Sequence, residues 1–331
     1  MTVFRMSLWL TAAGILLALA GCNRDSSSNE SAERPEDRAA LIAAQKAAYG
    51  EALAAAQASH GAGQPAMWVL KDEDTTLHIM GTVHLLRPDL DWRSEEIDAA
   101  LEAADTVVFE ADVTSEQAAS DMMKFISTKG MFTDGRQLTN LLTDDEKAEL
   151  ETALGKVGLP LGAVQPMKPW WAAVNLSVMQ IQKEGFDPNS GVETVLQFEA
   201  EQDGKAFAYL ETIDQQLGQL AAMSDELQVD FLISSATSIE EGGDVLDALV
   251  AEWADGDVNG IGVLMSNPEM TGSDELYDAL LVKRNKAWVG QIAAMLDEPG
   301  TRLIAVGTGH LAGDDSVIHL LRNEGYEVTG P

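Results

Sequence analysis

The sequence contains a single cysteine, Cys22, so no disulfide can form within the chain. Basic residues are also scarce: 21 lysines and arginines stand against 54 aspartates and glutamates, and the formal net charge is −33. A surface of this sign repels phosphate backbones and anionic lipid headgroups. We therefore expect no nucleic acid partner and no membrane contact through basic patches. The acidic residues are spread along the whole chain, as is typical of a solubilising surface.

Composition is that of a folded protein, although the familiar enzyme motifs are missing. Apolar residues make up 46% of the sequence and charged residues 23%, which provides material for a sizeable core. The sequence contains no Gly-x-Ser-x-Gly elbow, no phosphate loop and no dinucleotide-binding fingerprint. It therefore does not indicate the enzyme classes that these motifs mark.

The N-terminal residues have the pattern of a bacterial lipoprotein signal. Arg5 precedes an apolar run over residues 8–18, which is shorter than the stretch that a membrane-spanning helix needs. The run leads to Leu-Ala-Gly-Cys at residues 19–22, which resembles a lipobox. An ordinary signal peptide with a chance cysteine and an uncleaved anchor are the alternatives. We predict a signal peptide over residues 1–21 and a lipid on Cys22, and this lipidation leaves no thiol for a catalytic nucleophile.

The residues after the cysteine predict how the folded domain is held. Asn23 stands where an inner-membrane retention signal would usually carry Asp, so we predict an outer-membrane lipoprotein whose domain faces the periplasm. Residues 22–65 combine the lipidated cysteine with a polar tether and an alanine-rich stretch over residues 39–58, which we expect to be helical. The folded domain is expected over residues 66–331, with the membrane as a partner through the lipid anchor.

Within this domain, short β-type runs alternate with longer helical patterns. The alternation predicts a mixed α/β fold, with a central sheet flanked by helices. The β-type runs lie at residues 67–70, 75–80, 106–109, 206–210 and 302–306. Helical patterns lie at residues 94–104, 116–186, 215–265 and 315–323, and Gly325 is expected to stop the last helix.

Four of the predicted strands are followed by polar residues that share one chemistry: His84, Glu110, Glu211 and His310. Both histidines end a Gly-Thr-x-His tetrapeptide, whose glycines are Gly81 and Gly307. A glycine at the end of a strand permits a tight turn and a close backbone approach. If these strands are parallel neighbours, the four side chains meet at one rim, where open α/β sheets bind their ligands.

Two histidines with one or two glutamates suit a divalent cation such as manganese, cobalt or zinc. Such a cation lowers the pKa of water toward neutrality, and a carboxylate left uncoordinated can serve as general base. Taken singly, a strand-end histidine is often a turn residue, and a glutamate there is often a helix cap. Taken as a set, the four residues predict a metal site. The remaining histidines are expected elsewhere, in the linker, in a strand and in the last helix: His60, His78 and His319.

The paired Gly-x-x-His motifs, with a strand-end glutamate after the first, resemble the TraB/GumN family. That family is related to the Tiki proteases and, more distantly, to the erythromycin esterase and ChaN groups. The resemblance covers most of residues 67–329. Besides the two histidine motifs, the matching segments are Met67-Trp68-Val69, residues 108–112, Lys168-Pro169-Trp170-Trp171, Gly191-Val192-Glu193, Leu210-Glu211-Thr212 with Gln215, Lys283-Arg284-Asn285 with Trp288, and residues 320–328.

The resemblance implies a mixed α/β core with a large helical insertion between the two Gly-x-x-His halves. It also implies that the metal ligands or catalytic core are His84, Glu110 and His310. Glu211 and Arg284 would then be supporting members of the catalytic set. Arg284 would hold a substrate carboxylate, stabilise an oxyanion, or form an ion pair with a site glutamate. Glu193 stands where relatives often have Asp, and for that reason we leave it outside the core set.

These features together predict a metal-dependent hydrolase, namely a peptidase that acts on peptides or small proteins. Two alternatives stay open at this stage. The first is a lipoprotein that binds a metal or haem without turnover, which the ChaN resemblance would allow. The second is an interaction protein whose site has degenerated.

Overall fold

The computed structural model describes residues 60–241, 244–265 and 274–331, together with residues 50, 54 and 58. The predicted signal peptide, Cys22 and nearly all of the predicted tether lie outside these residues. Within the described ranges, no helix is long and apolar enough to cross a membrane.

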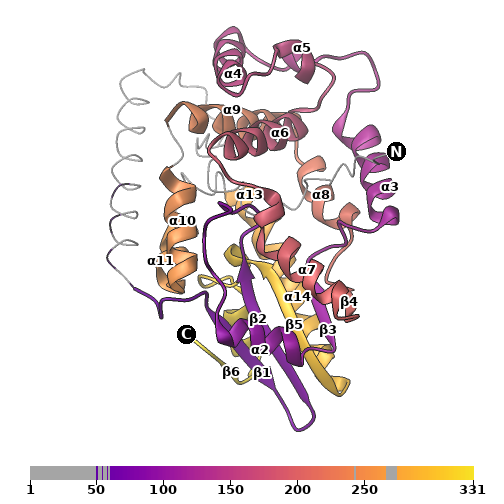
Figure 1. Ribbon diagram of the computed structural model, residues 1–331. Coiled ribbons are helices and arrows are strands. Elements are labelled where there is room, and N and C mark those ends of the chain that lie inside the picture. The colour runs from indigo at the N-terminus through magenta and orange to yellow at the C-terminus, as the bar shows by residue number, and fades with distance from the viewer. Residues whose placement is uncertain (1–49, 51–53, 55–57, 59, 242–243, 266–273) are drawn as a thin grey trace, which may run out of the picture.

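The centre of the molecule is a six-stranded sheet with the strand order β4-β3-β5-β2-β1-β6. The fold is therefore the mixed α/β class that the sequence predicted (Figure 1). The strands are β1 (Met67–Lys71), β2 (Thr75–Thr82), β3 (Thr106–Phe109), β4 (Ala206–Tyr209), β5 (Gly300–Gly307) and β6 (Val328–Thr329). The predicted β-type runs correspond to the first five of these strands. The two-residue β6, which pairs antiparallel with β1, was not predicted.

The four strands that lead to the candidate site residues are parallel neighbours. β4 pairs with β3, β3 with β5, and β5 with β2, all in parallel register. Phe109 lies level with both Tyr209 and Ala305, and Thr82 lies level with Gly307. Because parallel strands in register end at the same edge, this topology confirms that the four strand ends share one rim.

The two faces of the sheet are apolar, which explains why the strands are buried. Alternate residues point to opposite faces, so that Val107 and Phe109 join one core cluster while Val108 joins the other. On the first face the cluster includes residues of α2 (Glu95–Ala103) and α7 (Val192–Gln202). On the second face it includes residues of α14 (Lys283–Ala294) and α15 (Val317–Asn323).

The predicted helical insertion is present, and part of it lies beyond the carboxyl ends of the strands. Figure 1 shows α4 (Asp144–Val157), α6 (Pro169–Lys183) and α9 (Asp225–Glu241) stacked above that edge, and contacts between α6 and α9 are among the most extensive in the molecule. The insertion is formed by α3 (Glu116–Phe125), η3 (Ile126–Gly130), η4 (Leu138–Asn140), α4 (Asp144–Val157), α5 (Leu161–Val164), α6 (Pro169–Lys183), η5 (Pro188–Ser190), α7, α8 (Ile213–Ala221), α9 (Asp225–Glu241), α10 (Asp244–Asp255) and α11 (Val258–Met265).

After the insertion, the chain returns to the sheet through a short π-helical segment. α13 (Asp274–Tyr277) and the π-helix η6 (Asp278–Val282) run directly into α14. The remaining short elements are η7 (Met295–Asp297) and η8 (Thr308–His310). Ser94 and Ser316 cap α2 and α15 through side-chain oxygens, and Gly325 adopts a φ of 94° just after α15, as its predicted stop role requires.

Candidate functional site

The strand-end residues of the predicted set come together in a buried group at the carboxyl edge of the sheet. His84, Glu110, Glu211 and His310 follow β2, β3, β4 and β5, respectively, and each is between 1% and 8% exposed. A fifth member, Arg284, reaches the same group from α14 and is also buried. The sequence predicted all five, and the structure brings all five together.

Glu110 lies at the centre of this group. Its Oε1 accepts a hydrogen bond from the backbone N–H of Gly307 at 2.7 Å and lies 3.8 Å from Nε2 of His310. Its Oε2 lies 2.5 Å from Nη2 of Arg284 and accepts a second bond from Nε2 of Gln216 at 3.0 Å. Glu110 is therefore fixed from β5, α8 and α14 at once.

Arg284 joins the two glutamates. Its Nη2 lies 2.6 Å from Oε1 of Glu211, and its Nε donates to both oxygens of Glu211 at 3.1 Å. Its Nη1 donates to the carbonyl oxygen of Leu280 in η6 at 3.0 Å. Of the roles expected for Arg284, the ion pair with a site glutamate is the one that the structure shows.

Each histidine is held through Nδ1 by a different kind of partner. Nδ1 of His84 lies 2.5 Å from Oε1 of Glu193, and the same oxygen accepts a hydrogen bond from the Thr82 hydroxyl. Nδ1 of His310 lies 2.5 Å from Oδ1 of Asn285, the residue that follows Arg284 in α14. Nε2 of both histidines is buried and has no hydrogen-bond partner.

Trp288 packs this site from the second face of the sheet. Its ring centroid lies 4.4 Å from that of His310, and the guanidinium carbon of Arg284 lies 4.8 Å from the centroid of the Trp288 ring. A cation above an indole face is attracted by the ring electrons, so Trp288 stabilises the buried guanidinium while it limits movement of the imidazole.

The two motif glycines allow neighbouring side chains to approach the backbone closely, and neither of them adopts a left-handed conformation. Neither Gly81 nor Gly307 has a positive φ, and both lie at the ends of strands. A Cβ on Gly307 would lie 3.1 Å from Oε1 of Glu110 and 3.6 Å from Nε2 of His84. A Cβ on Gly81 would lie 2.8 Å from the hydroxyl of Thr308. These distances confirm the close approach expected of both glycines.

Burial and neighbouring charges shift the pKa values of the group in different directions. Although burial alone would raise the pKa of Glu110, Arg284 and the two histidines lower it to about 2, so that Glu110 is ionised. Burial and the nearby Arg284 lower the pKa of His310 to about 3, which leaves that imidazole neutral. Burial opposes charge on His84, but Glu193 raises its pKa, and burial raises the pKa of Glu211 against the effect of Arg284.

A family model described as TraB/PrgY/gumN matches residues 66–330, which is most of the chain. The chain belongs to the TraB/PrgY/gumN family. This result confirms the resemblance inferred from the paired histidine motifs. The matched residues begin and end close to the predicted folded domain, 66–331, although the boundaries of that domain stay a prediction.

Known members of this family include proteins both with and without a described activity. YbaP of Escherichia coli K12, an uncharacterised protein, is 25% identical over 258 residues, which cover 78% of this chain and 92% of YbaP. YbaP of Shigella flexneri is 25% identical over 74% of this chain and 87% of its own length. The metalloprotease TIKI2 of Danio rerio is 23% identical over 76% of this chain, but the match spans only 57% of TIKI2. No solved structure shows a significant match.

Three further site residues of this TraB/PrgY/gumN chain lacked a predicted role. Glu193 had been left outside the core set, yet its carboxylate contacts His84. Asn285 and Gln216 contact His310 and Glu110. Glu193 and Asn285 lie in segments that resemble the family, and this resemblance could have indicated them. Gln216 follows the recognised Gln215, but no feature of the sequence indicated Gln216 itself.

Gln215 completes a capping box with Thr212, so the helix cap next to Glu211 is formed by these two residues and not by the glutamate.

The donor set fits a divalent cation in chemistry, although its atoms are not at ligand spacing. Among the described residues, no group of three or more histidine, cysteine, aspartate and glutamate side chains is arranged to hold a metal ion. Nε2 of His84 and Nε2 of His310 are nevertheless buried without partners, beside Oε1 of the ionised Glu110. Arg284 contacts both Glu110 and Glu211, and a divalent cation held by the two Nε2 atoms would add positive charge beside these carboxylates.

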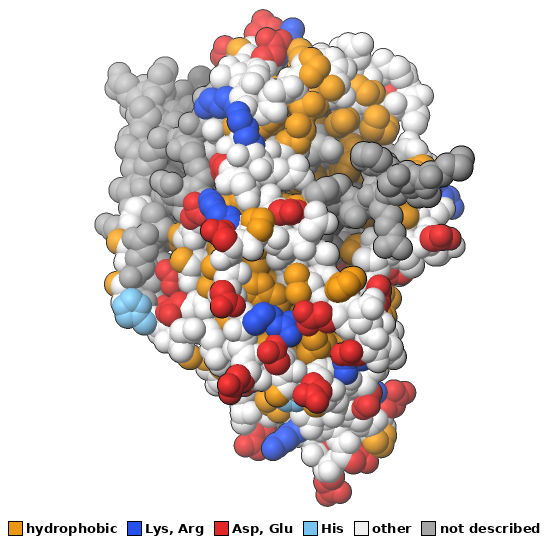
Figure 2. Space-filling view, viewed as in Figure 1, with side chains coloured by type: hydrophobic (Ala, Val, Ile, Leu, Met, Phe, Trp, Pro, Cys, Tyr) orange, Lys and Arg blue, Asp and Glu red, His pale blue; other side chains and the backbone are white. Residues whose placement is uncertain are grey.

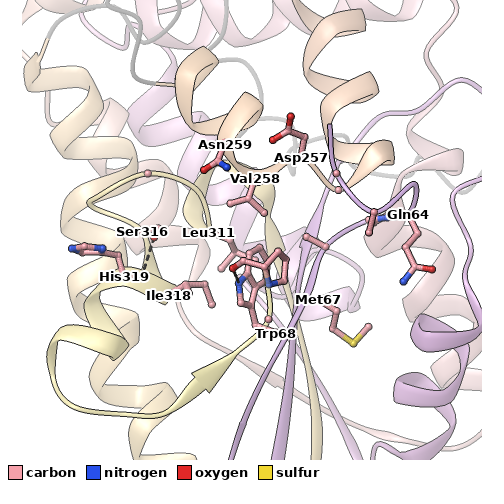
Figure 3. Close-up of a pocket in the computed structure, with 18 of the residues that line it drawn as sticks. Gln64, Met67, Trp68, Asp257, Val258, Asn259, Leu311, Ser316, Ile318 and His319 are labelled. Atoms are coloured by element: carbon pink, nitrogen blue, oxygen red, sulfur yellow. Dashed lines mark hydrogen bonds between the residues drawn. The ribbon is translucent and has the colours of Figure 1, made fainter. Parts of the chain in front are cut away.

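A separate cavity of about 650 Å³, drawn in Figure 3, is lined by none of the five site residues. Trp68, Val258, Leu311 and Ile318 form part of its wall, and the side chain of His319 lies at one side. Leu311 is its closest link along the chain to the site, since it follows His310. His60 and His319 line this cavity and His78 lies within β2, so these three histidines lie apart from the site, as predicted.

Proposed function

We propose that the protein is a metal-dependent hydrolase that cleaves peptide bonds in peptides or small proteins. His84, Glu110 and His310 would hold a divalent ion, namely manganese, cobalt or zinc. The observation that carries this proposal is the pair of unpartnered, buried Nε2 atoms beside the Glu110 carboxylate. Leaving a buried nitrogen without a partner costs about 1 to 3 kcal/mol of stability, and a bound cation would remove this cost for Nε2 of His84 and for Nε2 of His310.

The chain's own residues would then have separate tasks. Glu110, ionised and fixed by Gly307, Gln216 and Arg284, presents Oε1 toward the histidines. When bound, the cation supplies Lewis-acid chemistry, because it polarises a substrate carbonyl and lowers the pKa of water. Arg284 keeps Glu110 and Glu211 in place, and the burial of the whole group excludes bulk water.

Glu211 is the best candidate for proton transfer among the site carboxylates. Burial raises its pKa toward the working range of a general base, whereas the pKa of Glu110 is about 2. Glu211 also lies at the end of β4, outside the line of strands that carries the two histidines. We therefore assign Glu211 the proton-transfer role and Glu110 the ligand role.

Family membership supports hydrolysis more than storage of a ligand. TIKI2, a relative at 23% identity, is a metalloprotease by name. The alternatives, a binding lipoprotein that holds a metal or haem and an interaction protein with a degenerate site, are not favoured by these comparisons. The complete set of five predicted residues also occupies one buried group, in which Arg284 contacts both glutamates.

We further propose that the chain is lipidated at Cys22 and acts at the outer membrane, with its domain facing the periplasm. The support is the lipobox-like tetrapeptide and Asn23 after it. In the view of Figure 2, acidic side chains are scattered over the described surface, which fits contact with a membrane through a lipid and not through basic patches.

Elemental analysis of the full chain, purified in detergent without a histidine tag, tests the metal part of this proposal. We expect about one equivalent of divalent metal in the parent protein after incubation with manganese, cobalt or zinc. The variants His84→Ala and His310→Ala should lose this metal, whereas His319→Ala, on α15 beside the separate cavity, should retain it. Circular dichroism of each variant verifies folding.

A set of quenched fluorescent peptides and a small ester, assayed with the same preparations, tests the hydrolytic part. We expect cleavage of peptides by the loaded parent and by His319→Ala, and none by the two site variants. A parent protein that binds no metal, or that binds metal and cleaves none of the peptides in its loaded form, would contradict the proposal.

A further inference from the structure

The orientation of the Asn285 side chain identifies which nitrogen of His310 carries the proton. Nδ2 of Asn285 donates to the carbonyl oxygen of Asp315 at 2.7 Å, and a carbonyl can only accept. The atom of Asn285 that faces His310 is therefore Oδ1, which is also an acceptor. Contact between Oδ1 and Nδ1 of His310 at 2.5 Å thus requires a proton on Nδ1, and Nε2 of this neutral imidazole carries a lone pair.

The same argument applies to His84 through a different partner. A carboxylate oxygen of Glu193 lies 2.5 Å from Nδ1 of His84 as an ion-pair contact without aligned hydrogen-bond geometry, and because a carboxylate can only accept, this proximity favours a proton on Nδ1. Glu193 is held in this position by the Thr82 hydroxyl and by the start of α7, where the backbone N–H of Val192 donates to Val83. The helix that carries Glu193 is therefore attached directly to the first histidine motif.

Several polar atoms around the two histidines are buried without hydrogen-bond partners, which is unfavourable in free energy for a group that serves only packing. Oε2 of Glu193 is buried without a hydrogen-bond partner, and so are both Nε2 atoms. A side chain that served only packing would be replaced at lower free energy by an apolar residue of the same shape. A cation bound by the two Nε2 atoms would give both of them a partner.

We infer that Glu193 and Asn285 are positioning residues that hold a proton on Nδ1 of His84 and of His310, so that Nε2 of each ring is the nitrogen left to bind a divalent cation beside Glu110. This inference deepens the proposed function and rests on it for the identity of the ligand. Outer hydrogen-bond partners of metal-binding histidines orient the ring and raise its strength as a ligand. Because one partner is a carboxylate and the other an amide, His84 is the stronger ligand of the two.

The tautomers are measured directly on the full chain labelled with 15N-histidine, after treatment with a chelator. Long-range proton–nitrogen correlation spectra show which nitrogen of each imidazole carries the proton. We expect a proton on Nδ1 of His84 and of His310, assigned by comparison with His84→Gln and His310→Gln. A ring at either position whose Nδ1 carries no proton overturns the inference, and this measurement requires neither bound metal nor catalytic activity.

Cobalt binding, measured by competition with a chelator, provides the second test. Glu193→Leu and Asn285→Leu should each weaken cobalt binding by about 10- to 100-fold, because each removes the acceptor that holds one imidazole. Glu193→Gln keeps an acceptor oxygen, so it should retain the tautomer of His84 and weaken binding less than Glu193→Leu does. Gln197→Leu, one turn further along α7, and Gln291→Leu on α14 are matched controls and should bind cobalt as the parent does.

The outcomes separate this inference from the proposed hydrolase. Nδ1–H tautomers in a chain that binds no cobalt would leave the positioning roles supported and the metal-dependent hydrolase contradicted. Cobalt binding and peptide cleavage that are unchanged in folded Glu193→Leu and Asn285→Leu would overturn the positioning roles while the hydrolase stands. If the leucine variants do not fold, the spectra of the parent and of Glu193→Gln decide.

Discussion

Nη2 of Arg284 lies 2.5 Å from Oε2 of Glu110, and both side chains are buried at the carboxyl ends of the central strands. The same Nη2 also contacts Glu211, so one guanidinium compensates two carboxylates that would otherwise repel each other. The ion pair that organises this site therefore connects β3, β4 and α14, three elements that are far apart in the sequence.

Removal of this guanidinium should be strongly destabilising. Arg284→Met leaves Glu110 and Glu211 buried without a cation, and breaking such a buried pair costs about 3 to 5 kcal/mol. Urea denaturation of the variant gives this difference in the free energy of unfolding. Arg136→Met is the control, because the ion pairs of Arg136 with Asp134 and Asp225 are exposed and should contribute little to the free energy of unfolding. Equal losses in the two variants would contradict the buried ion pair.

Gly307→Ala should impair the site more than it impairs the fold. The new Cβ would lie 3.1 Å from Oε1 of Glu110, so the carboxylate must move by a few tenths of an ångström. We expect weaker metal binding and reduced peptide cleavage, with a midpoint of thermal unfolding close to that of the parent. Gly290→Ala on α14, where an added Cβ meets no atom within 4 Å, should leave metal binding unchanged and stabilise the fold by about 0.4 to 1 kcal/mol.

Trp253 should matter to the site through a single hydrogen bond. Its indole Nε1 donates to the carbonyl oxygen of Gly81 at 2.9 Å, directly in the first histidine motif. Trp253→Phe leaves that buried carbonyl without its donor, at a cost of about 1 to 3 kcal/mol. Trp170→Phe removes a comparable bond to Lys129 far from the motif, so it should lower stability without changing metal affinity. A Trp253→Phe variant that retains full metal affinity would show that this bond does not position the motif.

The lowered pKa of His310 predicts acid sensitivity. The pKa of His310 is about 3 in the folded chain and near 6.5 when unperturbed. Between these two pH values the imidazole is therefore protonated in the unfolded chain and neutral in the folded chain. The associated stability is fully present above pH 6.5 and is lost as the pH falls toward 3, by at most about 1.4 kcal/mol per pH unit. The raised pKa of Glu211 acts in the opposite sense, because protonation of that group favours the folded state.

Urea midpoints of chelator-treated protein between pH 6.5 and 5 test this acid sensitivity. His310→Gln retains Glu211 and lacks the titrating imidazole, so the decrease in stability over this range should be smaller in the variant than in the parent. An equal decrease in both proteins would show that His310 is not the group that resists protonation.

Much of the site was accessible from local pattern. Each strand is an apolar run that ends at a polar residue, and strands of this kind are recognised because apolar burial and residue propensity act within a few neighbouring positions. The repeated Gly-Thr-x-His tetrapeptide and the glutamates at the ends of β3 and β4 then identified four of the five core residues without knowledge of strand order. Arg284 came only from the resemblance to a family, since its segment of α14 carries no pattern of its own.

Other features depended on packing between distant elements. Glu193 and Gln216 lie on helices whose rotation about their own axes is set by the core, so the sequence near them does not say whether they point toward the site. The role of the motif glycines was similarly settled by proximity of Gly81 to Thr308 and of Gly307 to Glu110, across neighbouring strands. The two-residue β6 is too short to produce a periodic signal and exists because β1 offers an edge.

By itself, the sequence determined the class of fold, the positions of the main strands and the residue types available for chemistry, because these follow from local periodicity and composition. Only the tertiary structure decided that β2, β5, β3 and β4 lie side by side in parallel, which places the strand-end histidines and glutamates at one rim. It also decided the partner of each imidazole, a carboxylate for His84 and an amide for His310. Those pairings depend on how α7 and α14 pack against the sheet, and side-chain packing between elements far apart in the chain is not encoded in any local pattern.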